Sequence, residues 1–178
     1  AYYHHLWRKI PPRELPVLHK NCEALNIPLV FIEGDRTLEK TEAVARKHRY
    51  AQLTRLADDL GAEAVLTAHH ADDQVETILF RVFRGTGLDG LTGIHKKLVL
   101  TEAGAKPVPI LRPLLDVSRH ALSMIVQDKG LAYFTDPTNA DNKHHRNLIR
   151  NEILPSLERQ FPQIKNALFK LALVAEGD

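Results

Sequence analysis

The twenty residues 64–83, AVLTAHHADDQVETILFRVF, carry the pattern that decides the fold. Their first four residues form a short apolar run of the kind found in buried parallel strands. A polar segment, HHADD, follows shortly after this run. Apolar residues then recur with the spacing of an amphipathic helix, at Val75, Ile78, Leu79, Val82 and Phe83. A strand that leads through polar residues into a helix is typical of an α/β protein.

Strand and helix patterns alternate on both sides of this stretch. Further strands are predicted at residues 1–5, 29–32, 96–100, 108–111 and 133–134, and further helices over 11–26, 37–60, 118–130 and 164–174. A helical region is also expected from Lys143, broken or kinked at Pro155, and Asp72 is the expected N-cap of the helix after the 64–67 strand. The alternation predicts an α/β fold, an open parallel sheet with helices on both faces and a C-terminal helical extension.

Length and composition exclude several classes of protein. The chain has 178 residues, an apolar content of 44%, and 24 basic against 22 acidic residues. Such a balance does not favour a protein that coats a polyanion through massed Lys and Arg. The single cysteine, Cys22, excludes a disulfide framework and a four-cysteine metal site within these residues. No apolar run reaches the roughly 18 residues of a membrane span, so we expect a cytoplasmic, globular chain with no membrane partner.

Two carboxylates near the start of the 71–83 helix are candidates for chemistry. Asp73 and Glu76 are three residues apart, so they share one face of the first turns. In open parallel sheets, ligands bind beyond the carboxyl ends of the strands, where this segment lies. A carboxylate pair there suits an ammonium group or a magnesium ion. The alternative is that the acidic residues only complement the helix dipole, at about 0.3–1 kcal/mol each.

Arginines at helical spacing form the second group of candidates. Arg146 and Arg150 are four residues apart, so their guanidinium groups face the same way and can hold a phosphate. Arg46 and Arg49 lie on the 37–60 helix; for either set the alternative is a solvated helix face. The three adjacent histidine pairs predict no zinc site, because neighbours on a strand point to opposite faces.

Taken together, these segments closely resemble the tRNA(Ile)-lysidine synthetase family of the PP-loop ATP pyrophosphatase group. Residues 69–77 and 84–91 are similar to its HHxxDxxET and RGxGLxGL motifs. Three further matches follow in the family's order. Residues 42–50 match ExxARxxRY, and residues 112–115 match RPLL. In the third match, residues 136–139 correspond to Dx[ST]N and residues 146–150 to RNxxR. The matches run along nearly the whole chain.

The resemblance implies a two-step modification of tRNA. The enzymes of this family use ATP to adenylate the carbon-2 oxygen of the wobble cytidine in tRNA(Ile) with a CAU anticodon. The amine of free L-lysine then displaces AMP to give lysidine. Adenylation turns a poor leaving oxygen into a good one, and it needs magnesium and cationic donors at the transferring phosphate. The expected substrates and cofactors are therefore ATP, Mg²⁺, L-lysine and this tRNA. Whether the enzyme is a homodimer is a question that the resemblance does not answer.

The resemblance also assigns roles to individual residues. Asp73, Glu76 and His69 would bind lysine, and Asp73 would assist its amine as a catalytic residue. Arg49 and Arg150 would be catalytic groups that face phosphate. The remaining expected contacts to nucleotide or tRNA phosphate are Arg46, Arg112, Arg146, Gly85 and Gly87. Arg146 is also expected to order the helix that carries Arg150. The ligands of the metal stay unassigned.

The sequence departs from the family at one motif. The PP-loop itself, SGGxDS, has no match in the 178 residues, and residues 5–8 align just after the place where it would stand. About 40 residues, enough for a strand, a loop and a helix, would precede them. Residues 1–160 are then expected to form the catalytic domain, and 161–178 to begin a helical linker or C-terminal domain. Such a chain on its own is expected to bind ATP poorly and to be inactive.

Two other functions remain open on the sequence alone. A tRNA 2-thiocytidine type of modification needs paired cysteines, which a lone Cys22 does not supply. A non-catalytic tRNA-binding module would keep the scaffold without the ATP loop.

Overall fold

A computed structural model describes residues 1–6, 14–39, 41–100 and 106–177 of the chain. These residues fall into two compact units. The first contains Ala1–Val65, Leu98–Leu111 and Val126–Phe134; the second contains Leu66–Lys97, Arg112–Ile125 and Thr135–Asp178. Each unit is described by itself. No helix among the described residues is long and apolar enough to cross a membrane.

The first unit begins with a parallel strand–helix–strand motif. Strand β1 (Tyr2–His4) pairs in parallel with β2 (Phe31–Glu33), in the register Tyr2 to Phe31 and His4 to Glu33. Helix α1 (Glu14–Ala24) lies between them along the chain. This pairing confirms the α/β fold with a parallel sheet that the alternation predicted.

Helix α2 (Glu42–Asp59) supplies much of the buried surface of this unit. It begins later than residue 37, because Thr41 is the N-cap and accepts the Val44 N–H at 3.4 Å. Its inward residues, Tyr50 and Ala57 among them, are buried, and the helix contacts strand β5. The second sheet has the order β3 (Val65–Leu66), β5 (Val108–Leu111), β4 (Lys97–Leu100). On β5, Val108 and Ile110 alternate inward, as the period of a strand requires.

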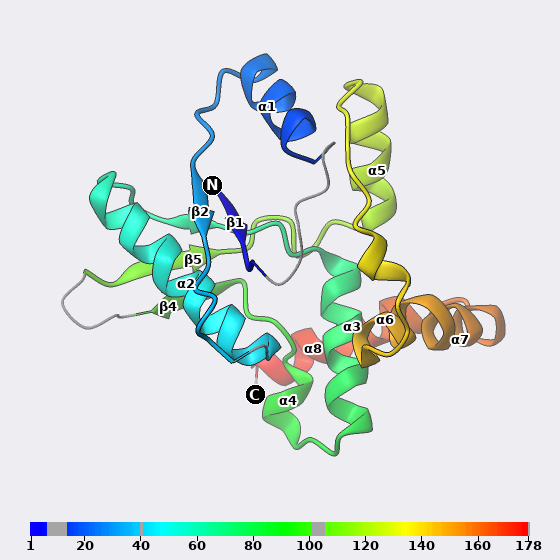
Figure 1. The fold of residues 1–178 in the computed structure, drawn as a ribbon. Coiled ribbons are helices and arrows are strands. Elements are labelled where there is room, and N and C mark those ends of the chain that lie inside the picture. Colours follow the sequence, from blue (N-terminus) through cyan, green and yellow to red (C-terminus); the bar gives the residue numbers. More distant parts are fainter. Residues whose placement is uncertain (7–13, 40, 101–105, 178) are drawn as a thin grey trace. The chain divides into compact units, whose positions relative to one another are not determined.

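Helix α3 (Ala71–Phe83) is the centre of the second unit, and Figure 1 shows it among α4 (Leu88–Leu91), α6 (His145–Leu148) and α8 (Ile164–Gly177). Its predicted apolar stripe is confirmed over its first half. Val75 and Leu79 pack with Ile149 and Leu154 in the core of the unit, whereas Val82 and Phe83 at its end are exposed.

The elements that follow α5 (Arg119–Asp128) differ from the sequence expectation in two places. Residues 133–134 form no strand, and Tyr133 is 77% exposed. A 3-10 helix, Pro137–Ala140, follows. Pro155 does not break the helical region, which continues from α6 through a π-helical segment, Ile149–Ile153, into α7 (Leu154–Gln160). The wider turn just before Pro155 accommodates a residue that has no N–H to donate.

Gly93 lies just after α4 in a backbone conformation that favours glycine. Its φ is +66°, and a Cβ there would stand 2.5 Å from Oε1 of Gln74. The Gln74 side chain cannot move aside easily, because it donates to the Thr92 carbonyl at 2.9 Å and accepts from the Ile94 N–H at 2.5 Å.

We therefore expect Gly93→Ala to lower the free energy of unfolding by about 2 kcal/mol or more, through left-handed strain and overpacking. Gly87→Ala is the matched control, since Gly87 has a negative φ and open space around it; it should change stability by less than about 0.5 kcal/mol. Denaturant unfolding measures both variants. Equal stabilities would contradict this account of the loop.

Candidate active site

The start of α3 is fixed by a reciprocal pair of hydrogen bonds. The Asp73 N–H donates to Nδ1 of His70 at 3.4 Å, and the His70 N–H donates to Oδ2 of Asp73 at 3.0 Å. His70 is therefore the N-cap, and the expectation that Asp72 would cap the helix is wrong. The Asp72 carboxylate instead accepts the Arg119 N–H at 2.7 Å and pairs with Lys165 at 3.1 Å. This capping box orients the Asp73 side chain.

Asp73 and Glu76 share one face of α3, as their spacing predicts, and two arginines meet them there. Arg146 reaches both carboxylates, through Nε to Glu76 at 3.0 Å and through Nη2 to Asp73 at 2.9 Å. Arg150 holds Glu76 in a bidentate arrangement at 2.6 and 2.8 Å, and its Nη2 lies 3.5 Å from Asp73. We call these four residues the carboxylate–guanidinium cluster.

Burial differs strongly within the cluster. The Glu76 side chain is 2% exposed and that of Asp73 14%, whereas Arg150 and Arg146 are 23% and 33% exposed. The hydrogen bonds to Glu76 raise the pKa of Arg150 above its usual range. Two carboxylates balance two guanidinium groups, so the cluster is neutral. Bidentate pairing of this kind is strong and fixes orientation.

This arrangement changes the interpretation of both pairs. From the sequence, the carboxylates were expected to hold an ammonium or a metal ion, and the arginines a phosphate. In the structure the two carboxylates form ion pairs with the two guanidinium groups. Nη1 of each arginine still forms no hydrogen bond with any described residue and has two N–H groups to offer. The cluster can therefore present oriented donors to an anion.

Other candidates in this unit lie in different surroundings. Nδ1 of His69 lies 2.9 Å from the Thr67 hydroxyl, on the residues that lead into α3. Gly85 and Gly87 are exposed in the loop after α3, with φ of +73° at Gly85. Arg112 is only 4% exposed and donates to the His95 carbonyl at 2.5 Å. Its Nε is buried and has no hydrogen-bond partner among the described residues.

Arg46 and Arg49 belong to the first unit, on α2. Their guanidinium carbons lie 5.2 and 5.6 Å from the centre of the Tyr50 ring, which is a cation–π distance. Tyr50 itself is buried. Tyr50 thus contributes to placing both side chains of the ExxARxxRY segment.

The described residues hold no preassembled cluster of metal-ligating side chains. They contain no group of three or more His, Cys, Asp or Glu side chains placed to hold a metal ion. The carboxylates that would suit magnesium best, Asp73 and Glu76, are already held by guanidinium groups. No chemical step is therefore assigned to a metal bound by these residues.

Several residues that shape the site escaped the sequence analysis. Arg81 donates to the carbonyls of Gly90 and Gly93 at 3.0 and 2.8 Å and so orders the glycine loop. Gln74 is buried beside the apolar stripe of α3, and a lone polar residue on such a face is a signal that could have been used. Lys165 gives no comparable signal, since it is a partly buried lysine at the start of a mainly apolar helix.

Glu76→Gln should lower the free energy of unfolding by about 3 kcal/mol, because a neutral amide leaves two guanidinium groups without their shared anion. Glu63→Gln, at an exposed loop position, is the control and should change stability by less than about 0.5 kcal/mol. Chemical denaturation of both variants checks this. A Glu76→Gln variant as stable as the control would show that the cluster does not support the fold.

Comparisons with known proteins give the relatives of this chain. It is 37% identical over 158 residues to a tRNA(Ile)-lysidine synthase of Parabacteroides distasonis, covering 85% of this chain and 34% of that protein. It is 33% identical to that of Bacteroides thetaiotaomicron, covering 93% and 38%, and 42% identical to that of Salinispora arenicola, covering 77% and 40%. The chain thus spans between a third and two fifths of the length of these curated relatives.

A solved structure and a family model agree on the fold. The U34-tRNA thiolase NcsA from Methanococcus maripaludis, with its [4Fe-4S] cluster, superposes with a TM-score of 0.73 over 98% of this chain and 61% of that one. At 15% identity, this likeness concerns the fold alone. The model of the PP-loop domain family matches residues 1–157. The resemblance found in the sequence is thereby confirmed, and the chain belongs to the PP-loop domain family.

Proposed function

We propose that this chain is the catalytic part of a tRNA(Ile)-lysidine synthase. ATP adenylates the carbon-2 oxygen of the wobble cytidine in tRNA(Ile) with a CAU anticodon, and L-lysine displaces AMP. The observation that carries the proposal is the carboxylate–guanidinium cluster, in which the HHxxDxxET and RNxxR segments make contact. The names of the relatives support the same reaction.

In the first step the cytidine oxygen bonds to the α-phosphorus of ATP, and pyrophosphate leaves. The transferring phosphate carries negative charge that oriented N–H donors stabilise. Arg150 and Arg146 offer such donors through Nη1. The hydrogen bonds to Glu76 hold both guanidinium groups in place. Arg112, Arg49 and Arg46 are further candidates for phosphate contacts, and so is the loop at Gly85 and Gly87, in which the Gly85 N–H already donates to the Val82 carbonyl at 3.0 Å.

In the second step a lysine amine bonds to carbon 2, and the oxygen leaves with AMP. Asp73 is the better of the two carboxylates for receiving this amine, since it is more exposed than Glu76 and its contact with Arg150 is the longest in the cluster, at 3.5 Å. A phosphate that draws Arg150 toward itself removes the longest contact of Asp73 Oδ1, which then keeps the hydrogen bond from Arg146 at 2.9 Å and has a lone pair for the amine. Asp73 then orients the amine and accepts its proton, His69 lines the same approach, and Glu76 acts as a positioning residue.

The proposed domain boundary follows the family match. Residues 1–160 would be the catalytic domain, in keeping with a match that ends at residue 157. Residues 161–178, which include α8, would begin a linker or C-terminal domain. ATP is the proposed co-substrate. Magnesium is expected to arrive with ATP rather than on the described carboxylates.

In the full-length protein, Asp73→Asn should lower lysidine formation at least about 100-fold, since the amide keeps the size of the side chain but cannot take a proton. Turnover is measured with labelled lysine on tRNA(Ile) transcripts. Asp89→Asn, at an exposed position of α4, is the control and should keep full activity. Normal turnover in Asp73→Asn, with normal folding, would refute the role of Asp73.

A further inference from the structure

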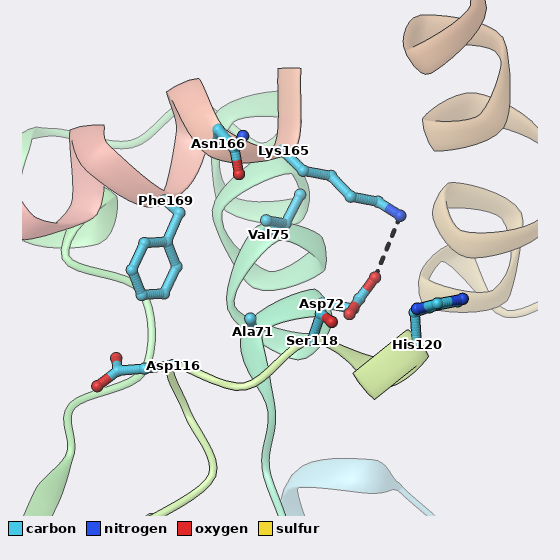
Figure 2. Close-up of a pocket in the computed structure, with 9 residues that line it drawn as sticks. All are labelled: Ala71, Asp72, Val75, Asp116, Ser118, His120, Lys165, Asn166 and Phe169. Atoms are coloured by element: carbon cyan, nitrogen blue, oxygen red, sulfur yellow. Dashed lines mark ion pairs between the residues drawn. The ribbon is translucent and has the colours of Figure 1, made fainter. Parts of the chain in front are cut away.

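The first turn of α3 also has partners outside the carboxylate–guanidinium cluster. Asp72 lines a cavity of about 250 Å³ whose wall also includes Lys165 of α8. Figure 2 shows the Lys165 side chain reaching toward the Asp72 carboxylate, and the two form an ion pair at 3.1 Å. Consecutive residues of a helix point about 100° apart. A group that holds Asp72 therefore acts on the same turn that carries the neighbouring Asp73.

Helix α8, which carries Lys165, packs on the core of the second unit. Ile164 and Leu168 of α8 pack against the buried cluster to which Val75 of α3 belongs. Lys165 follows Ile164 directly, so this packing also holds its backbone in place. The match to the PP-loop domain family ends at residue 157, before α8 begins. Lys165 thus stands outside the family match but is anchored to the same core as α3.

Asp72 receives its two main contacts from different segments. Its Oδ2 accepts the Arg119 N–H at 2.7 Å, and its Oδ1 lies 3.1 Å from Nζ of Lys165. The Asp72 side chain is 17% exposed, so water can replace a lost partner only in part. Burial acts to raise the pKa of Asp72, but the Arg119 N–H and Lys165 outweigh it and hold that pKa below its usual value. Asp72 is therefore a carboxylate at neutral pH, and Lys165 balances its charge.

The ring of His70 lies close to both Asp72 and Asp73. Its Nδ1 accepts the Asp73 N–H at 3.4 Å in the capping box, and its Nε2 lies 3.5 Å from Oδ2 of Asp73. The same Nδ1 is 3.9 Å from Oδ2 of Asp72. A hydrogen bond of 3.4 Å is long, so a competing carboxylate can break it. An Asp72 without its cation would attract the His70 ring, whose Nδ1 would then donate to Asp72 instead of accepting from Asp73.

We propose that Lys165 is a positioning residue for Asp73, a role that rests on the proposed function and deepens it. The ammonium group of Lys165 balances the charge of Asp72, so the His70 ring stays with Asp73 and the capping box keeps its geometry. Asp73 then keeps the direction in which it receives the amine. Lys165 contacts Asp72 and Glu158 rather than the cluster. Its effect is therefore confined to the second step, because Asp73 has no proposed role in adenylation.

Separate measurement of the two steps in the full-length protein tests this role. Lys165→Met should slow the transfer of lysine to adenylated tRNA about tenfold, because a small misplacement of a reacting group is costly. Pyrophosphate release in a single turnover without lysine should change by less than about twofold. The Lys165 side chain is 36% exposed, so its ion pair contributes little to stability and the variant should fold. Lys170→Met, at an exposed position of α8, is the matched control and should equal the parent protein in both steps.

A second substitution distinguishes positioning from packing. Asp72→Asn removes the charge that Lys165 balances, and the amide oxygen can still accept the Arg119 N–H. Added to Lys165→Met, it should restore the second step to within about threefold of the parent protein. An unchanged second step in Lys165→Met, equal losses in both steps, or no recovery in the double variant would overturn the inference and leave the proposed function intact. A parent protein that forms no lysidine would instead contradict the proposed function.

Discussion

The buried carboxylate of Glu76 is the interaction on which the rest of this site depends. It is 2% exposed and takes hydrogen bonds from two guanidinium groups. An anion so buried costs several kcal/mol of desolvation unless it is paired and hydrogen-bonded. Pairing it with Arg146 and Arg150 connects α3 to the helical stretch 70 to 74 residues later in the chain. The pairing of Glu76 with the two arginines therefore supports the fold of the second unit and also sets the geometry of the cluster.

The three acidic residues at the start of α3 differ in their partners and in their burial. Glu76 is buried and takes hydrogen bonds from both arginines, Asp73 is more exposed, and Asp72 pairs with Lys165 instead. The His70 cap fixes where this turn begins, so it also fixes the directions of Asp72 and Asp73.

Local patterns in the sequence predicted most of the elements, with the strand at 133–134 as an exception, and failed on contacts between distant segments. The apolar spacing of α3 correctly placed Val75 and Ile78 inside, and the spacing of three placed Asp73 and Glu76 on one face. No local signal indicates that these acids meet Arg146 and Arg150, because that contact depends on tertiary packing. The π-helical segment at Arg150 was missed for the same reason, since Pro155 alone favours a break. The roles of the site residues remain proposals.

A double-mutant cycle on Glu76 and Arg150 tests the central claim most directly. Lysidine formation by the full-length protein is measured for Glu76→Gln, Arg150→Lys and the double variant. If Glu76 acts by positioning Arg150, each single variant removes much of the same function, and the double variant is little worse than either. Rate losses that multiply, as they do for independent residues, would contradict the account.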